Sequence, residues 1–110
     1  LSCNTHAIVA ARLGRDAEAY SYFRRAAALD LDAINDVTRD GLHAAALGGT
    51  WQMVVFGFAG LDPRAEAPVF RPRLPSAWRR VTFSVVFQGQ RKRITIEGDR
   101  VSSSDVPRVR

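Results

Sequence analysis

The sequence is poor in cysteine, lysine and histidine: its 110 residues hold one Cys, one Lys and two His. Because Cys3 is alone, no disulfide can form within the chain and a cysteine-based zinc site is not expected. A reducing compartment suits such a chain, so we expect a cytoplasmic protein. Neither a signal-peptide pattern nor a run of eighteen apolar residues is present, and we therefore expect no membrane partner.

The usual catalytic motifs are also missing. The chain has no phosphate-cradling loop followed by a lysine and no serine-centred turn of the hydrolase type. His6 and His43 are too far apart in the sequence for a helical pair of metal ligands. We therefore expect no metal and no cofactor.

Basic residues are abundant but unevenly placed. Residues 1–60 carry five basic and six acidic side chains, whereas residues 61–110 carry eleven basic and five acidic ones. A basic half can indicate nucleic-acid binding. No stacking platform or groove-reading motif accompanies these scattered arginines, so we expect no nucleic-acid partner.

The first half of the chain is typical of a helical hairpin. One helix is expected over Asn4–Leu13, capped by Asn4 or Thr5 and ended by Gly14. A second is expected over Asp16–Leu29 because small and aromatic residues recur with helical spacing, at Ala19, Tyr22, Phe23, Ala26 and Ala27. The short link predicts an antiparallel pair.

A third helical segment is expected after a polar loop over residues 30–39. It begins at Asp40, ends between Phe56 and Gly60, and is apolar on nearly every side, which predicts a helix surrounded by others, with Trp51 packed. Two short helices are too few partners for it. Together with the first residue, Leu1, this mismatch suggests a piece of a longer protein.

The composition changes after Gly60. Four prolines between residues 63 and 75 predict a linker over residues 61–78, anchored by Trp78. Alternating apolar residues then predict a hairpin with a Gln88-Gly89 turn, its inner positions being Val81, Phe83, Val85, Phe87, Ile94 and Ile96. A lone hairpin is marginally stable, so it should belong to a larger sheet. From Ser102 onward the sequence suggests a tail.

His43 is the strongest candidate for a chemical role. It has two interpretations: a core histidine held through one ring nitrogen, or an anion ligand. If Asp40 caps the third helix, His43 lies in the first turn, where free N–H groups and the helix dipole favour an anion. Ser2 and Thr5 lie near the start of another helix. Gly48-Gly49 costs roughly 2 kcal/mol of helix propensity, which close packing, a break or a ligand must offset.

Several segments together resemble glycoside hydrolase family 65, the maltose, trehalose and kojibiose phosphorylases. The most specific is "DGLHAAALGGTW"; "LSCNTHAIVAARLG", "AEAYSYFRRAAALDL" and "RPRLPSAWRRVTFSVVFQGQRKRITI" follow the same family in order. The resemblance covers roughly residues 1–97. It implies an α+β fragment: the last helices of an (α/α)6 barrel over residues 1–60, the linker, and part of a C-terminal β-sandwich over residues 79–110.

The resemblance also implies a reaction. Inorganic phosphate would attack the anomeric carbon of an α-glucoside with inversion, giving β-glucose 1-phosphate, while a glutamate protonates the leaving oxygen. It assigns phosphate binding to His43 and Ser2, with Gly48, Gly49 and Thr50 as weaker candidates. Neither Glu18 nor Glu66 has the context of the general acid, which we expect upstream, so the 110 residues alone should be inactive. The partners implied are a disaccharide and phosphate, and the resemblance allows a homodimer.

Two alternatives stay open. A hydrolase of the same family needs a base to activate water, and Asp40 is an acidic residue close to His43. A non-enzymatic module, built from the helical hairpin and a basic β-ribbon, would account for the second helix and the basic half. It gives no reason for the Asp-Gly-Leu-His or Gly-Gly-Thr-Trp clusters.

Overall fold

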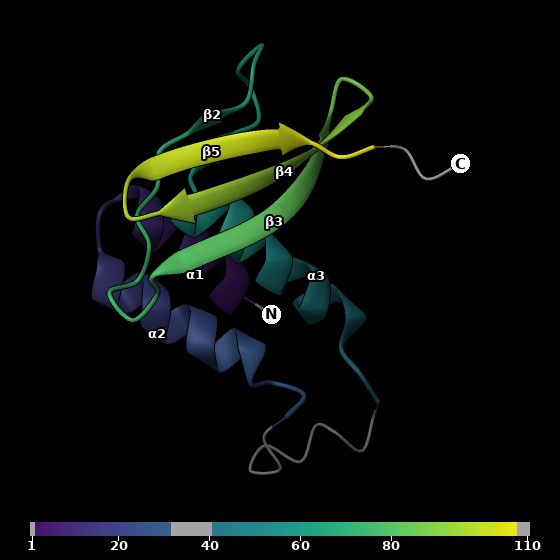
Figure 1. Cartoon of the computed structure of the whole chain (residues 1–110). Coiled ribbons are helices and arrows are strands. Elements are labelled where there is room, and N and C mark those ends of the chain that lie inside the picture. The colour runs from purple at the N-terminus through teal and green to yellow at the C-terminus, as the bar shows by residue number, and fades with distance from the viewer. Residues whose placement is uncertain (1, 32–40, 108–110) are drawn as a thin grey trace.

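The computed structural model describes residues 2–31 and 41–107. Helices form one layer and antiparallel strands lie beside it, so the expected α+β organisation is confirmed (Figure 1). The helices are α1 (Cys3–Arg12), α2 (Asp16–Ala27) and α3 (Ala44–Gln52), and α3 continues into the π-helix η3 (Met53–Phe58). None of the helices described is long and apolar enough to span a bilayer.

The predicted helical hairpin is confirmed, with helix ends that lie within two residues of the predicted ones. Gly14 has a φ of 75° and its N–H donates to the carbonyl of Ala11, which ends α1 with the left-handed residue that glycine tolerates best. The two helices pack through small side chains, since Ala7, Ala10, Ala11, Ala19 and Ala26 are all buried. Small residues let the helix backbones approach closely.

The third helical segment passes over this hairpin. Met53 is fully buried between α1 and α2, and Val55 and Ala59 are fully buried on the side of the sheet. Trp51, in contrast, is 46% exposed, so the prediction of a packed Trp51 is wrong in this structure. At about 100° per residue, Trp51 falls on the side of α3 opposite its buried residues, Ala46 and Gly49.

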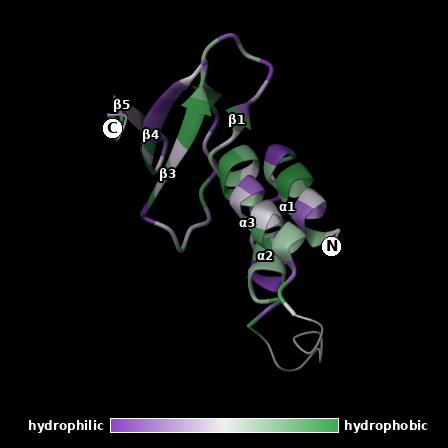
Figure 2. Cartoon of the chain, turned by 90° about the vertical axis from the view of Figure 1, so that its right-hand side faces the viewer, coloured by the Kyte–Doolittle hydropathy of each residue, from purple (hydrophilic) through white to green (hydrophobic). Residues whose placement is uncertain are grey.

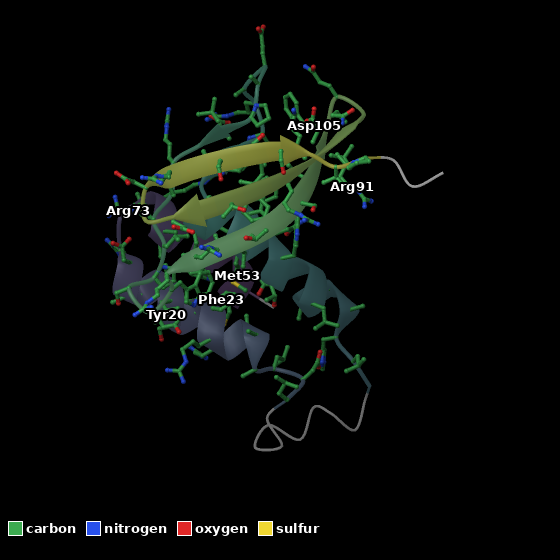
Figure 3. All side chains as sticks on the ribbon, viewed as in Figure 1. Tyr20, Phe23, Met53, Arg73, Arg91 and Asp105 are labelled. Carbon is green, nitrogen blue, oxygen red and sulfur yellow. The ribbon has the colours of Figure 1, made fainter. Side chains whose placement is uncertain are left out.

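The proline-rich segment is more structured than a linker. Its strands β1 (Leu61–Asp62) and β2 (Val69–Phe70) pair in antiparallel fashion. Trp78 anchors the segment as predicted, because its ring contacts Phe23, Phe58 and Tyr20 at centroid distances of 5.2, 5.2 and 6.2 Å. Tyr20 and Phe23, labelled in Figure 3, both belong to α2, and their rings stack with centroids 6.3 Å apart.

The predicted hairpin is part of a three-stranded sheet in the order β3 (Arg80–Phe87), β4 (Gln90–Glu97), β5 (Arg100–Asp105). Gln88 and Gly89 have φ of 48° and 77°, the pair of positive values that a tight hairpin turn requires. Val85, Ile94 and Ile96 pack on Val55 and Ala59, which joins the sheet to the helical layer (Figure 2).

The prediction of a tail from Ser102 onward is wrong, since residues 100–105 form the strand β5. Every residue of β5 is exposed, and its sequence RVSSSD has no apolar alternation by which to recognise a strand. Pairing with β4 makes it one: Ile94 lies opposite Ser103, and Lys92 forms an ion pair with Asp105 at 3.0 Å. Asp105 and Arg91 mark this end of the sheet in Figure 3.

Candidate functional site

Three helix ends meet at one end of the helical layer. Asn4 lies against Gly49 and Ile8 against Gly57, so α1 and the α3–η3 segment run in the same direction. Because α2 runs antiparallel to α1, the end of α2 lies at the same side as the starts of α1 and α3 (Figure 1). This arrangement brings together residues that are far apart in the sequence.

A short polar contact at this end joins Asp30 to His43. The ring Nδ1 of His43 lies 2.7 Å from Oδ1 of Asp30, and the backbone N–H of His43 donates to the same carboxylate at 3.1 and 3.3 Å. Asp30 belongs to the turn that follows α2, thirteen residues before His43. One carboxylate therefore fixes both the backbone and the ring of a single residue.

His43 occupies the N-cap of α3 rather than its first turn, which corrects the predicted placement. Its ψ of 81° is not helical, while its carbonyl accepts hydrogen bonds from the N–H groups of Ala46 and Leu47. The Asp30 carboxylate accepts the N–H of His43, so the chain enters the helix at this residue. The predicted cap, Asp40, lies outside the described residues.

The environment of the pair suits an ionised carboxylate and an accessible imidazole. The hydrogen bond from His43 holds the pKa of Asp30 below its ordinary value of 3.8. The Asp30 side chain is only 8% exposed, whereas that of His43 is 31% exposed. No residue of the described part bonds Nε2 of His43, and no unpaired side-chain nitrogen there is buried, so Nε2 faces solvent.

The start of α3 adds partial positive charge beside His43. The first turn of α3 contains no acidic residue, and the N–H groups of a helix start carry the positive end of its dipole. An anion close to Nε2 would therefore meet an imidazole and a helix start together.

Ser2 lies at the same end, at the N-cap of α1, with its side chain exposed. Its carbonyl accepts hydrogen bonds from the backbone N–H and Nδ1 of His6, at 3.1 and 2.7 Å, which leaves the Ser2 hydroxyl available. Asn4 of α1 lies beside Gly49 of α3. Ser2 comes two residues before Asn4 and His43 comes six residues before Gly49, so His43 lies about four residues, or roughly 6 Å along the helix axis, beyond Ser2. The structure thus places both predicted phosphate ligands at one end of the helical layer; the role itself stays a prediction.

The three weaker candidates for phosphate binding, Gly48, Gly49 and Thr50, have different surroundings. Gly49 is buried against Asn4, Gly48 is exposed with no neighbour where a side chain would extend, and the Thr50 hydroxyl donates to the carbonyl of Ala46 at 2.9 Å. Gly49 has a packing role and Thr50 is bonded within its own helix. Phosphate binding at these three positions stays a prediction.

Asp30 was not singled out from the sequence, where it opens a polar loop. A signal was available: an acidic residue just after a helix is disfavoured by the negative end of the dipole and needs another reason to be there.

In residues 2–31 and 41–107, no cluster of three His, Cys, Asp or Glu side chains could hold a metal ion.

Comparison with known proteins identifies both halves of the chain. Residues 1–52 match the model of the glycosyl hydrolase family 65 central catalytic domain, and residues 61–106 match that of the family's C-terminal domain. The two models together account for nearly all of the chain.

Curated relatives agree over the same length. The chain is 38% identical over 101 residues to the alpha,alpha-trehalose phosphorylase of Thermoanaerobacter brockii and 39% identical over 104 residues to the kojibiose phosphorylase of Halothermothrix orenii. These matches cover 92% and 94% of the chain but 13% of each relative. The chain therefore spans about an eighth of the length of these enzymes.

A solved structure matches as well. A chain described as a kojibiose phosphorylase from the human microbiome superimposes with a TM-score of 0.86 over 97% of this chain and 15% of its own length, at 27% identity. The arrangement of helices and sheet is thus the one found where the two domains of such an enzyme join. With both domain models matched in order, the chain belongs to glycosyl hydrolase family 65.

Proposed function

We propose that the chain is the C-terminal part of an inverting α-glucoside phosphorylase that uses inorganic phosphate to release β-glucose 1-phosphate. The observation that carries this is His43, an accessible imidazole held by Asp30 at the start of α3, on the same side as Ser2. An N–H on Nε2 would donate a charge-assisted hydrogen bond to phosphate. The relatives are phosphorylases of trehalose, kojibiose, maltose and 1,2-alpha-glucosylglycerol, which supports phosphate as the shared co-substrate.

The proposed chemistry needs position more than basicity. A phosphate dianion is already a nucleophile, so the protein must hold it in line with the bond that breaks and balance its charge. Inversion places the acid that protonates the leaving oxygen on the opposite face of the sugar. Of the acidic residues considered for that role, Glu18 lies near the start of α2, far from the end where His43 lies, and is paired with Arg15.

We therefore propose that the general acid belongs to another part of the full-length protein and that the 110 residues alone are inactive. Relatives of similar identity are named for different sugars, and we propose that residues outside this segment contribute to the choice of sugar. We further propose a cytoplasmic enzyme, a homodimer, that uses phosphate as co-substrate and needs no cofactor.

The test uses the full-length protein that contains this chain. Trehalose, kojibiose and maltose are each incubated with and without inorganic phosphate, and ¹H NMR identifies the sugar products and the anomer of glucose 1-phosphate. Phosphate-dependent formation of the β-anomer supports the proposal. Glucose release that does not require phosphate selects the hydrolase, and formation of the α-anomer overturns inversion.

A further inference from the structure

The contact between Asp30 and His43 decides which ring nitrogen of His43 can meet a ligand. Nδ1 lies 2.7 Å from a carboxylate oxygen, and an ionised carboxylate can only accept a hydrogen bond, so Nδ1 carries a proton and donates it. Nε2 is then the ring nitrogen left to face solvent. A histidine without Asp30 could present either nitrogen.

The same contact bears on the charge of the ring. For Nε2 to donate to phosphate while Nδ1 donates to Asp30, both nitrogens must carry protons and the imidazole must be cationic. The Asp30 carboxylate lies against Nδ1, so its negative charge faces the ring in that state. An amide in place of the carboxylate would keep a hydrogen bond but lose the charge.

Asp30 also fixes the backbone to which the ring is attached. Its carboxylate accepts the N–H of His43 at 3.1 Å, and its side chain is 8% exposed, so water competes little for these bonds. A side chain held at both its backbone and its ring keeps one orientation and loses little freedom on binding a ligand.

Resting on the proposed function, we propose that Asp30 is a positioning residue for phosphate: it holds His43 with Nε2 outward and places a negative charge beside the ring that donates to the phosphate dianion. Asp30 does not touch phosphate itself. It acts through His43, in the way that carboxylates behind a metal site orient the histidines that bind the metal.

The experiment is Asp30→Asn in the full-length enzyme, with KM for phosphate and KM for the glucoside measured separately. We expect the KM for phosphate to rise about tenfold, while the KM for the glucoside changes less than about twofold, since the change acts at the anion and not at the sugar. The matched control is Asp62→Asn, because Asp62 likewise accepts the backbone N–H and the side chain of one residue, Arg64, away from this site. The control should leave both KM values unchanged.

Two further variants separate positioning from folding. In a His43→Ala background, Asp30→Asn should add no further loss of phosphate binding, because the residue it acts through is gone. Asp30→Glu keeps the charge and should retain more affinity for phosphate than Asp30→Asn. If Asp30→Asn does not fold, the KM for phosphate is measured with Asp30→Glu instead. An unchanged phosphate KM, or equal losses for Glu and Asn, overturns the inference. If the wild type needs no phosphate, it is the proposed function that fails.

Discussion

The side chain of Asn4 occupies the space that a Cβ atom at Gly49 would need. A Cβ built on Gly49 would come 1.6 Å from Nδ2 and 3.2 Å from Cβ of Asn4, whereas one on Gly48 would meet nothing within 4 Å. Of the two adjacent glycines in this helix, only Gly49 is therefore required for packing.

Gly49→Ala should accordingly destabilise the protein, by about 1–3 kcal/mol, because Asn4 must move away from a crowded contact between α1 and α3. Gly48→Ala is the matched control and should stabilise α3 by about 0.5–1 kcal/mol. Chemical denaturation of the two variants measures the difference. A stable Gly49→Ala variant would show that the close approach of α1 and α3 is not needed.

His43→Ala should abolish most phosphate-dependent turnover while leaving the fold intact, since His43 is partly exposed and its ring contributes little to the core. Removing a charge-assisted hydrogen bond to the attacking dianion should cost about 2–3 kcal/mol, or roughly 30- to 150-fold in kcat/KM for phosphate. Steady-state kinetics with thermal unfolding as the control checks this. Phosphate dependence that survives the change would remove His43 from the site.

Asp30 should make stability depend on pH in a defined direction. Its pKa is lower in the folded chain than the ordinary value of 3.8, so its interaction with His43 stabilises the fold above about that pH and is lost as the pH falls through the lower folded value. The difference in unfolding free energy between wild type and Asp30→Asn should therefore narrow below pH 3.8. Urea titrations between neutral pH and the acid range measure it, and a difference that widens on acidification would contradict the assignment.

Trp78→Ala should loosen the connection between the helical layer and the segment that leads to the sheet. The ring contacts three other aromatic rings, on α2 and η3, so its removal should cost about 3 kcal/mol. Trp78→Phe keeps one ring in the cluster and should cost clearly less. Differential scanning calorimetry compares the two, and equal losses would mean that the aromatic contacts do not hold this connection.

The elements predicted from the sequence are those whose signal is local. The hairpin could be recognised because its apolar alternation and its Gln88-Gly89 turn lie within adjacent residues, and the first two helices because Gly14 separates two periodic segments. β5 could not, because its polar residues become a strand only through pairing with β4. An all-round apolar helix does not reveal which side is covered, so the placement of Trp51 was missed.

The candidate site, too, was predicted only in part from the sequence. The family resemblance pointed to His43 and Ser2, but the partner of His43 lies thirteen residues away at the end of another helix, and no spacing rule connects the two. The exact entry into α3 was also missed, because a carboxylate from outside the helix determines it. Contacts that depend on how helices assemble have no counterpart in the order of residues.

The contact between Asp30 and His43 makes the position of the imidazole a property of how two helices pack. Asp30 lies just after the end of α2 and His43 at the N-cap of α3, so a shift of one helix against the other would move the carboxylate and the ring apart. Substitutions in the core between these helices can therefore alter the site without changing any residue in it.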